Sequence, residues 1–197
     1  VYAHRAPFNA GWWPGGASST GASAINRWLE GAAREALKFN RTQLKNSPIF
    51  YPLAGQGERF PFVSASAEAF AVQGVFPSVA EHGIEITFAA IAKGLAFVER
   101  LCFDLLDLIG YQIDGNVSFT GGGANNADWS QLRSTVLGVQ VAVPTAKEGA
   151  IGMAILAAAA CDQETANEVR LAASADRMLG ESTWSSPNAD DQVWLLE

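Results

Sequence analysis

The sequence is poor in the side chains that carry most metal and nucleophilic chemistry. Its 197 residues include two histidines and two cysteines. Cys102 and Cys161 lie far apart in apolar segments and match no metal-ligand spacing, so we expect buried free thiols in a reducing cytoplasm and no metal site in this chain. No Gly-x-Ser-x-Gly nucleophile elbow occurs either. These absences argue against hydrolases with a Ser or Cys nucleophile.

Positive charge and long apolar runs are also scarce. Thirteen Lys and Arg residues stand against 20 Asp and Glu, for a formal net charge of -7. This balance offers no electrostatic footprint for a polyanion, so we expect no nucleic-acid partner. The longest apolar run, residues 150–160, falls well short of the roughly 20 residues that a membrane-spanning helix requires. We expect no membrane partner and interpret this run as a buried helix.

Glycine is abundant, and its most informative cluster follows an apolar strand. Gly121, Gly122 and Gly123 come after the strand expected at residues 116–120 and before a helix expected from about Trp129. Glycine lets a ligand approach the backbone, and a helix that starts just afterwards directs unpaired N–H groups at the turn. Taken alone, such a run of glycines more often marks an ordinary loop that binds no ligand. The turn is not the dinucleotide fingerprint, because Asn126 occupies the place of its last glycine, and the chain contains no Gly-Lys of a P-loop.

The rest of the chain predicts an α/β protein. Alternation of strand and helix from residue 116 onward favours a parallel arrangement, in which ligands bind beyond the carboxyl ends of the strands. The expected strands are residues 1–5, 11–14, 116–120 and 139–143, and the expected helices are 22–36, 85–109, 129–137, 149–160 and 164–179. Residues 38–47 are interpreted as a polar surface connection. Residues 50–62 are expected to form an ordered, aromatic-rich loop packed on the core.

Two charged residues interrupt that apolar loop. Glu58 and Arg59 could belong to a functional site or could form a self-contained structural pair, and the structural interpretation is favoured. Asp190 and Asp191, near the end of the chain, are interpreted as ordinary solvated acids.

Several motifs occur together in a fixed order. Residues 15–21 read Gly-Gly-Ala-Ser-Ser-Thr-Gly, residues 57–61 read Gly-Glu-Arg-Phe-Pro, residues 94–97 read Gly-Leu-Ala-Phe, and residues 148–152 read Glu-Gly-Ala-Ile-Gly. With the Thr120–Ala124 turn and Trp129, they resemble in order and spacing the FGGY carbohydrate kinases, in particular pentulose kinases such as D-ribulokinase and xylulokinase. One departure is Lys93, which stands where the family usually has Glu.

The resemblance implies a fold and a domain organisation. It implies an actin-like (ribonuclease-H-like) fold of two domains, with residues 1–197 forming most of the C-terminal one. The N-terminal domain and the first strands of this domain would precede Val1. A strand edge would then be left unpaired, so we expect marginal stability of the chain alone, or an edge covered by another chain, with a homodimer as one form.

The resemblance also implies a ligand site and its residues. Gly121, Gly122, Gly123 and Ala124 would line the adenosine and phosphate side of an ATP site, and Asn125 or Asn126 would touch the base or ribose. The segment that contains Gly21 and Ser23 would flank the same cleft. Phosphoryl transfer in such enzymes depends on positioning and on charge stabilisation around Mg²⁺.

The family's catalytic Asp would lie before Val1, so no catalytic residue is assigned in this chain. Our first hypothesis is that the chain is the nucleotide-binding part of an ATP-dependent kinase that phosphorylates a pentulose, ribulose or xylulose. The alternative is a stand-alone, non-catalytic module that binds nucleotide or a partner chain.

Overall fold

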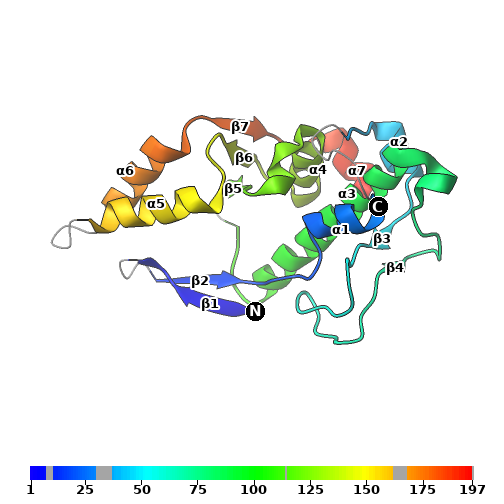
Figure 1. The fold of residues 1–197 in the computed structure, drawn as a ribbon, viewed down its shortest axis with the longest axis horizontal. Coiled ribbons are helices and arrows are strands. Elements are labelled where there is room, and N and C mark those ends of the chain that lie inside the picture. Colours follow the sequence, from blue (N-terminus) through cyan, green and yellow to red (C-terminus); the bar gives the residue numbers. More distant parts are fainter. Residues whose placement is uncertain (8–10, 30–36, 114, 162–167, 197) are drawn as a thin grey trace.

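The computed structural model describes residues 1–7, 11–29, 37–113, 115–161 and 168–196. It is an α/β structure, and Figure 1 colours its elements in chain order. The elements are β1 (Tyr2–Arg5), β2 (Trp12–Gly15), α1 (Ala22–Trp28), α2 (Arg41–Asn46), β3 (Phe50–Tyr51), β4 (Phe70–Ala71), α3 (Val79–Leu108), β5 (Val117–Ser118), the 3₁₀ helix η2 (Gly122–Asn125), α4 (Ala127–Leu137), β6 (Val141–Pro144), α5 (Gly149–Ala160), α6 (Glu168–Leu179), β7 (Ser182–Ser185) and α7 (Ala189–Leu196).

The described strands form three small sheets. β1 and β2 pair antiparallel, as do β3 and β4. The third sheet has the order β5-β6-β7, in which β5 runs parallel to β6 and β7 runs antiparallel to it. β5, α4 and β6 form a parallel strand–helix–strand unit, which places the glycine turn at the carboxyl end of β5.

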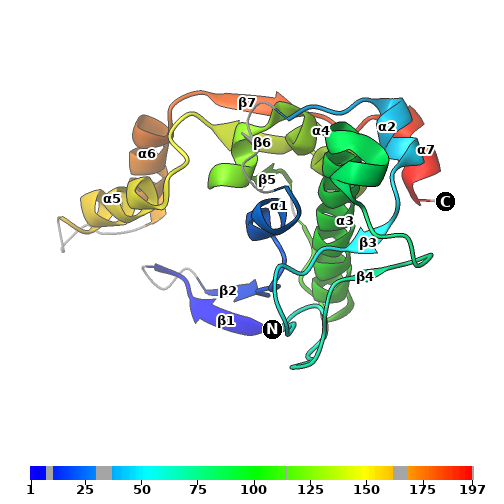
Figure 2. The same cartoon turned by 45° about the vertical axis from the view of Figure 1, so that its right-hand side comes forward.

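The long helix α3 is the centre of the core. Its residues from Thr87 to Ala96 are all buried, and they pack with α1, α2 and α4. The helix begins at Val79, earlier than expected, because the Ser78 hydroxyl caps it by accepting from the Glu81 N–H. Gly83 (φ 79°) interrupts the helical geometry near this end. Figures 1 and 2 show α3 passing between α1 on one side and β3 and β4 on the other.

The apolar helix α5 has the predicted bounds but not the predicted burial. Of its side chains, only Ile155 and Ala159 are buried, and Met153 is 67% exposed. In both Figure 1 and Figure 2, α5 and α6 lie side by side at the end of the molecule farthest from α2 and α7. The expectation of a buried helix is wrong for this structure, because α6 is its main packing partner and covers one side of it.

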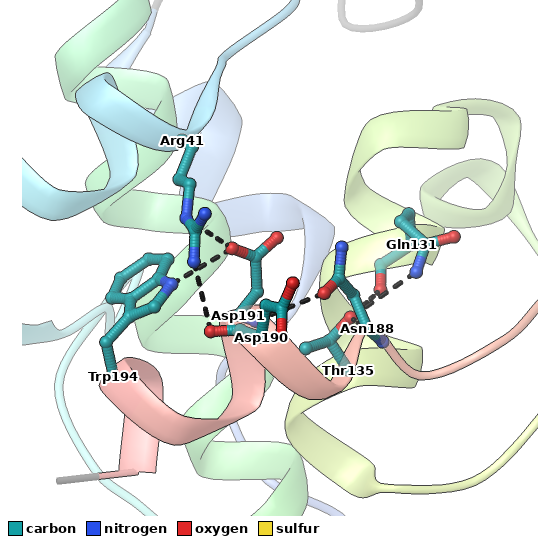
Figure 3. A network of polar contacts seen from close by, with 7 residues as sticks. All are labelled: Arg41, Gln131, Thr135, Asn188, Asp190, Asp191 and Trp194. Atoms are coloured by element: carbon teal, nitrogen blue, oxygen red, sulfur yellow. Dashed lines mark hydrogen bonds and ion pairs between the residues drawn. The ribbon is translucent and has the colours of Figure 1, made fainter.

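The C-terminal helix docks on the opposite end of the molecule. Figure 3 shows Arg41 of α2 between Asp191 and Trp194 of α7. The Arg41 guanidinium lies 2.6 Å from the Asp191 carboxylate and also donates to the Asp190 carbonyl, and the Trp194 indole donates to Asp191. Asp191 is therefore paired, and the interpretation of it as an ordinary solvated acid is wrong.

Two further expectations differ from the structure. The segment 38–47 contains α2, which a capping box of Asn40 and Gln43 stabilises and whose Leu44 is buried, so it is not merely a surface connection. The helix expected at 22–36 is confirmed over Ala22–Trp28, and its part at 30–36 lies outside the described residues. The same holds for residues 164–167 of the helix expected at 164–179, which is otherwise confirmed as α6.

Candidate functional site

A cavity of about 580 Å³ lies between the two glycine-rich segments. One wall is the stretch from Pro14 to Ala22, and another is the turn that contains Gly122 and Gly123. Apolar side chains of α3 form the floor, together with Trp129 of α4 and Phe60 of the aromatic loop. A volume of this size falls in the range of small-molecule sites. The structure thus brings together two motifs that are about 100 residues apart in the sequence.

The three glycines of the turn differ in whether the structure requires glycine at their positions. Gly121 adopts a positive φ of 75°, which an L side chain rarely accepts. A Cβ on Gly123 would lie 3.1 Å from the Trp129 ring, so packing within the protein requires glycine there. Gly122 has neither reason, because its φ is not positive and a Cβ there would meet no atom within 4 Å. Gly122 lines the cavity, and an added methyl group there would have open space around it.

The remaining residues expected in the turn divide into exposed and buried ones. Asn125 is exposed, whereas Ala124 and Asn126 are 5% and 6% exposed. The Asn126 side chain caps α4 by accepting from the Trp129 N–H at 3.0 Å, and its amide donates to the Leu37 carbonyl at 2.7 Å. Asn126 therefore fixes the turn to the core. Within this turn, Gly122 and Gly123 line the cavity, whereas Asn125 lies outside its lining.

Of the two residues expected to flank the cleft, the structure brings one to the cavity. Gly21 lines it, with a φ of 126°, just before α1 begins. Ser23 is exposed on α1 and does not contribute to the described lining. Ser18 and Thr20, which the sequence did not single out individually, line the wall beside Gly21.

Glu58 has a larger structural role than its place in the sequence indicated. Its side chain is 2% exposed, and its carboxylate accepts hydrogen bonds from the Ser19 N–H, the Tyr51 hydroxyl and the Ser18 hydroxyl at 2.6, 2.7 and 2.8 Å. It meets Arg59 through the backbone N–H rather than through the guanidinium. The expected self-contained pair of Glu58 and Arg59 is thus replaced by a contact between two segments 40 residues apart.

These hydrogen bonds set the protonation of the network. Burial would raise the pKa of the Glu58 carboxyl, but the bonds from the Ser19 N–H, the Tyr51 hydroxyl, the Arg59 N–H and the Ser18 hydroxyl outweigh it and hold this pKa below its ordinary value. Burial and the neighbouring Glu58 raise the pKa of Tyr51. Glu58 is therefore ionised and Tyr51 is protonated at neutral pH.

An ion pair borders the apolar floor of the cavity. Arg133 of α4 donates from both Nε and Nη2 to the two carboxylate oxygens of Glu99 on α3. Its guanidinium carbon lies 3.2 Å from the centre of the Phe119 ring, a cation–π contact that fixes it further. Cys102 lies on the same floor, and burial, with the nearby carboxylates of Glu58 and Glu99, raises its pKa to about 11. This thiol is therefore protonated and a weak nucleophile at neutral pH.

The described residues lack the features of two other kinds of site. Within them, no three His, Cys, Asp or Glu side chains gather closely enough to hold a metal ion. Among the helices that the structure describes, none combines the length and the apolar character needed to cross a membrane.

Solved structures that resemble this chain are carbohydrate kinases. A xyloylose kinase from Brucella ovis matches with a TM-score of 0.55 and 23% identity over 82% of this chain. A gluconate kinase from Lactobacillus acidophilus matches with a TM-score of 0.58 and 20% identity over 79%. Plasmodium falciparum glycerol kinase, solved with ADP, matches with a TM-score of 0.53 and 17% identity over 78%. At these identities the likeness shows a shared fold.

The chain is much shorter than these enzymes, since it covers 30%, 31% and 30% of their respective lengths. The model of the FGGY family of carbohydrate kinases, C-terminal domain, matches residues 9–161, which include both walls of the cavity. The α/β structure agrees with the fold of these enzymes. The chain belongs to the FGGY family of carbohydrate kinases and contains the family's C-terminal domain.

Proposed function

We propose that this chain is the nucleotide-binding C-terminal domain of an ATP-dependent sugar kinase with an actin-like fold, and that the whole enzyme phosphorylates a hydroxyl group of a pentulose. In this proposal residues 1–197 form one domain, and an N-terminal domain supplies the catalytic Asp and most of the sugar site. The cavity between Gly21 and Gly122 is the C-terminal wall of the nucleotide cleft.

Gly122 is the observation that carries this proposal. Neither backbone conformation nor packing requires glycine at this position, which lines the cavity and has open space where a Cβ would stand. A flat base or a ribose lying against the turn would require that space. The apolar floor formed by Leu95, Val98 and Phe103 suits the nucleoside better than the phosphates.

Mg²⁺ would arrive with ATP and supply charge stabilisation for the transferred phosphoryl group. The described residues present no cluster of metal ligands, so phosphate oxygens and the N-terminal domain would hold the ion. This chain's own part is to bind the nucleoside and to exclude water from it.

The test uses the full gene product that carries this chain, assayed for ADP formation from ATP with xylulose, ribulose, gluconate and glycerol. We expect turnover that requires ATP and is fastest with a pentulose. Gly122→Ala should raise the KM for ATP by about tenfold or more, which corresponds to about 1.4 kcal/mol of lost binding. Gly152→Ala is the matched control, because its Cβ would also meet open space, but on α5 away from the cavity.

Two outcomes would contradict the proposal. An absence of ATP-dependent phosphorylation of all four compounds would favour a non-catalytic binding module. Equal KM values for ATP in the Gly122→Ala and Gly152→Ala variants would show that the turn is not part of the nucleotide site.

A further inference from the structure

Glu58 is a buried anion that no described cation neutralises. The Arg59 guanidinium, the nearest basic group in sequence, is directed instead at the Ser18 carbonyl at 3.5 Å. The charge is met by neutral donors, namely the Ser18 and Tyr51 hydroxyls and the Ser19 and Arg59 N–H groups, with the Phe60 N–H farther away at 3.4 Å. Because burying a charge is costly unless donors surround it, the segments that supply these donors are held firmly around the carboxylate.

Two of the donors belong to the wall of the cavity. The Ser18 hydroxyl gives its proton to Glu58 and accepts from the Thr20 N–H at 3.0 Å and from the Thr20 hydroxyl at 2.8 Å. The Ser19 N–H donates to the other carboxylate oxygen of Glu58. One carboxylate thus organises the whole Ser18–Thr20 turn, which continues directly into Gly21 and α1.

The same wall is fixed from a second direction. Gly16 packs against the Phe60 ring so closely that a Cβ would come within 2.2 Å of it. Phe60 is two residues from Glu58, so the aromatic loop holds the wall through an apolar contact and a charged contact at once. The wall lines the same cavity as Gly122 and Gly123, and its position therefore affects the shape of the cavity.

The hydrogen-bond pattern also determines which polar groups the wall offers to a ligand. The Ser19 and Thr20 N–H groups and the Ser18 hydroxyl all donate within the network, so these groups are not available to an anion. The Thr20 hydroxyl gives its proton to Ser18 and keeps lone pairs free to accept. A wall of this kind suits neutral groups that donate, such as hydroxyls, and the negative charge of Glu58 behind it disfavours a phosphate.

We propose that Glu58 is a positioning residue for the ligand of this cavity, which holds the Ser18–Gly21 wall against the neutral, hydroxyl-bearing part of the nucleotide and away from its phosphates. This inference rests on the proposed function, because it takes the ligand to be a nucleotide. Glu58 itself does not contact the ligand in this arrangement. Its effect passes through Ser18 and Ser19.

The experiment measures binding of ADP and of adenosine to the full gene product by calorimetry. Glu58→Gln keeps the shape of the side chain but removes the charge and one acceptor, so we expect about tenfold weaker binding of both ligands. Ser18→Ala should weaken both by a similar factor. Tyr51→Phe removes a donor to the same carboxylate from outside the wall, and we expect it to change either affinity by less than about threefold.

A matched variant separates positioning from general loss of stability. Leu44→Ala destabilises the core on α2 and is not part of the cavity lining. We expect it to lower the melting temperature at least as much as Glu58→Gln does, yet to leave ADP affinity unchanged. In hydrogen exchange of the unliganded protein, Glu58→Gln should speed exchange in residues 16–21 and leave residues 121–126 unchanged.

The binding measurements distinguish a failure of the proposed function from a failure of the positioning role of Glu58. If the unmodified protein does not bind ADP, the proposed function is overturned. If it binds ADP and Glu58→Gln binds both ligands as tightly, the positioning role is overturned alone. Weaker binding of adenosine with stronger binding of ADP would show that Glu58 acts by its charge on the phosphates, which also contradicts the role proposed here.

Discussion

At the scale of single residues, glycine is used for different purposes along the cavity. Gly121 supplies a backbone conformation, Gly123 gives room to Trp129, and Gly16 gives room to Phe60. Of these four, only Gly122 has neither a positive φ nor a neighbouring atom that a Cβ would meet. A cluster of glycines in a sequence therefore does not identify a ligand site until the packing around each one is known.

These differences predict an order of stability for alanine variants of the turn. Gly122→Ala should leave the free energy of unfolding within about 0.5 kcal/mol of the unmodified chain, as for a surface change. Gly121→Ala should cost about 1–2 kcal/mol, because alanine would be forced to a positive φ. Gly123→Ala should lie between them, since the Trp129 ring must shift by a few tenths of an ångström. Urea unfolding measures all three, and a Gly122 variant as unstable as the Gly121 variant would contradict this account.

Lys93 predicts a dependence of stability on pH. Lys93 is 4% exposed, its ammonium group donates to the carbonyls of Leu44 and Ser47 at the end of α2, and burial lowers its pKa to about 8. In the unfolded chain the pKa returns to about 10.4. Between these values the unfolded state binds a proton that the folded state has released, so stability rises with pH.

The measurement compares urea unfolding of the unmodified chain and Lys93→Met at pH 8 and pH 10. We expect the unmodified chain to gain about 1–2 kcal/mol relative to the variant over this interval. Lys45→Met, at an exposed position on α2, is the control and should show no such gain. Parallel pH profiles for Lys93→Met and the unmodified chain would show that Lys93 stays protonated in the fold.

At the scale of elements, the close approach of α3 to β3 depends on one position. A Cβ on Gly94 would lie 2.3 Å from the Phe50 carbonyl oxygen, which is backbone and cannot turn aside. The helix therefore packs directly on the strand that carries Tyr51, a donor to Glu58. The element that forms the floor of the cavity and the loop that holds its wall are joined at this contact.

Gly94→Ala is expected to destabilise the fold although alanine favours helices. Helix propensity alone would add about 1 kcal/mol of stability, but overpacking against backbone costs about 1–3 kcal/mol and here must displace the strand. We expect a net loss of about 1–2 kcal/mol in thermal or urea unfolding. Gly152→Ala, in open space on α5, should instead gain up to about 1 kcal/mol. A neutral Gly94→Ala would mean that α3 can move away from β3 at little cost.

Sequence patterns predicted the elements better than their contacts. The bounds of α5 were predictable to the residue because apolar composition and flanking breaks are local signals, whereas its exposure depends on which neighbours surround it. The polar helix α2 lacks an apolar stripe, and its capping box was the available signal. The role of Glu58 could not be predicted from spacing, because its partners Ser18 and Ser19 lie about 40 residues earlier.

At the scale of the whole molecule, apolar surface is left uncovered on one side. Of the described strands, none pairs with the outer edge of β5. Met153 on α5 and Trp12 and Trp13 on the β1–β2 hairpin are each more than half exposed. Figures 1 and 2 both show α5 and this hairpin at the same end of the molecule. Exposed patches and open strand edges of this kind mark surfaces where other chains associate.

We therefore expect the isolated 197-residue chain to self-associate at micromolar concentrations. Sedimentation velocity should show a sedimentation coefficient that rises with protein concentration. Met153→Lys should reduce this association, because burying a methionine side chain contributes about 1.5–3 kcal/mol and a lysine ammonium at the contact opposes it. The variant should melt within about 2 °C of the unmodified chain, since Met153 is exposed in the monomer. Val63→Lys, also exposed but in the segment between β3 and β4, is the control. A monomer that unfolds cooperatively and does not associate at any concentration would show that this surface is stable without contact with another chain.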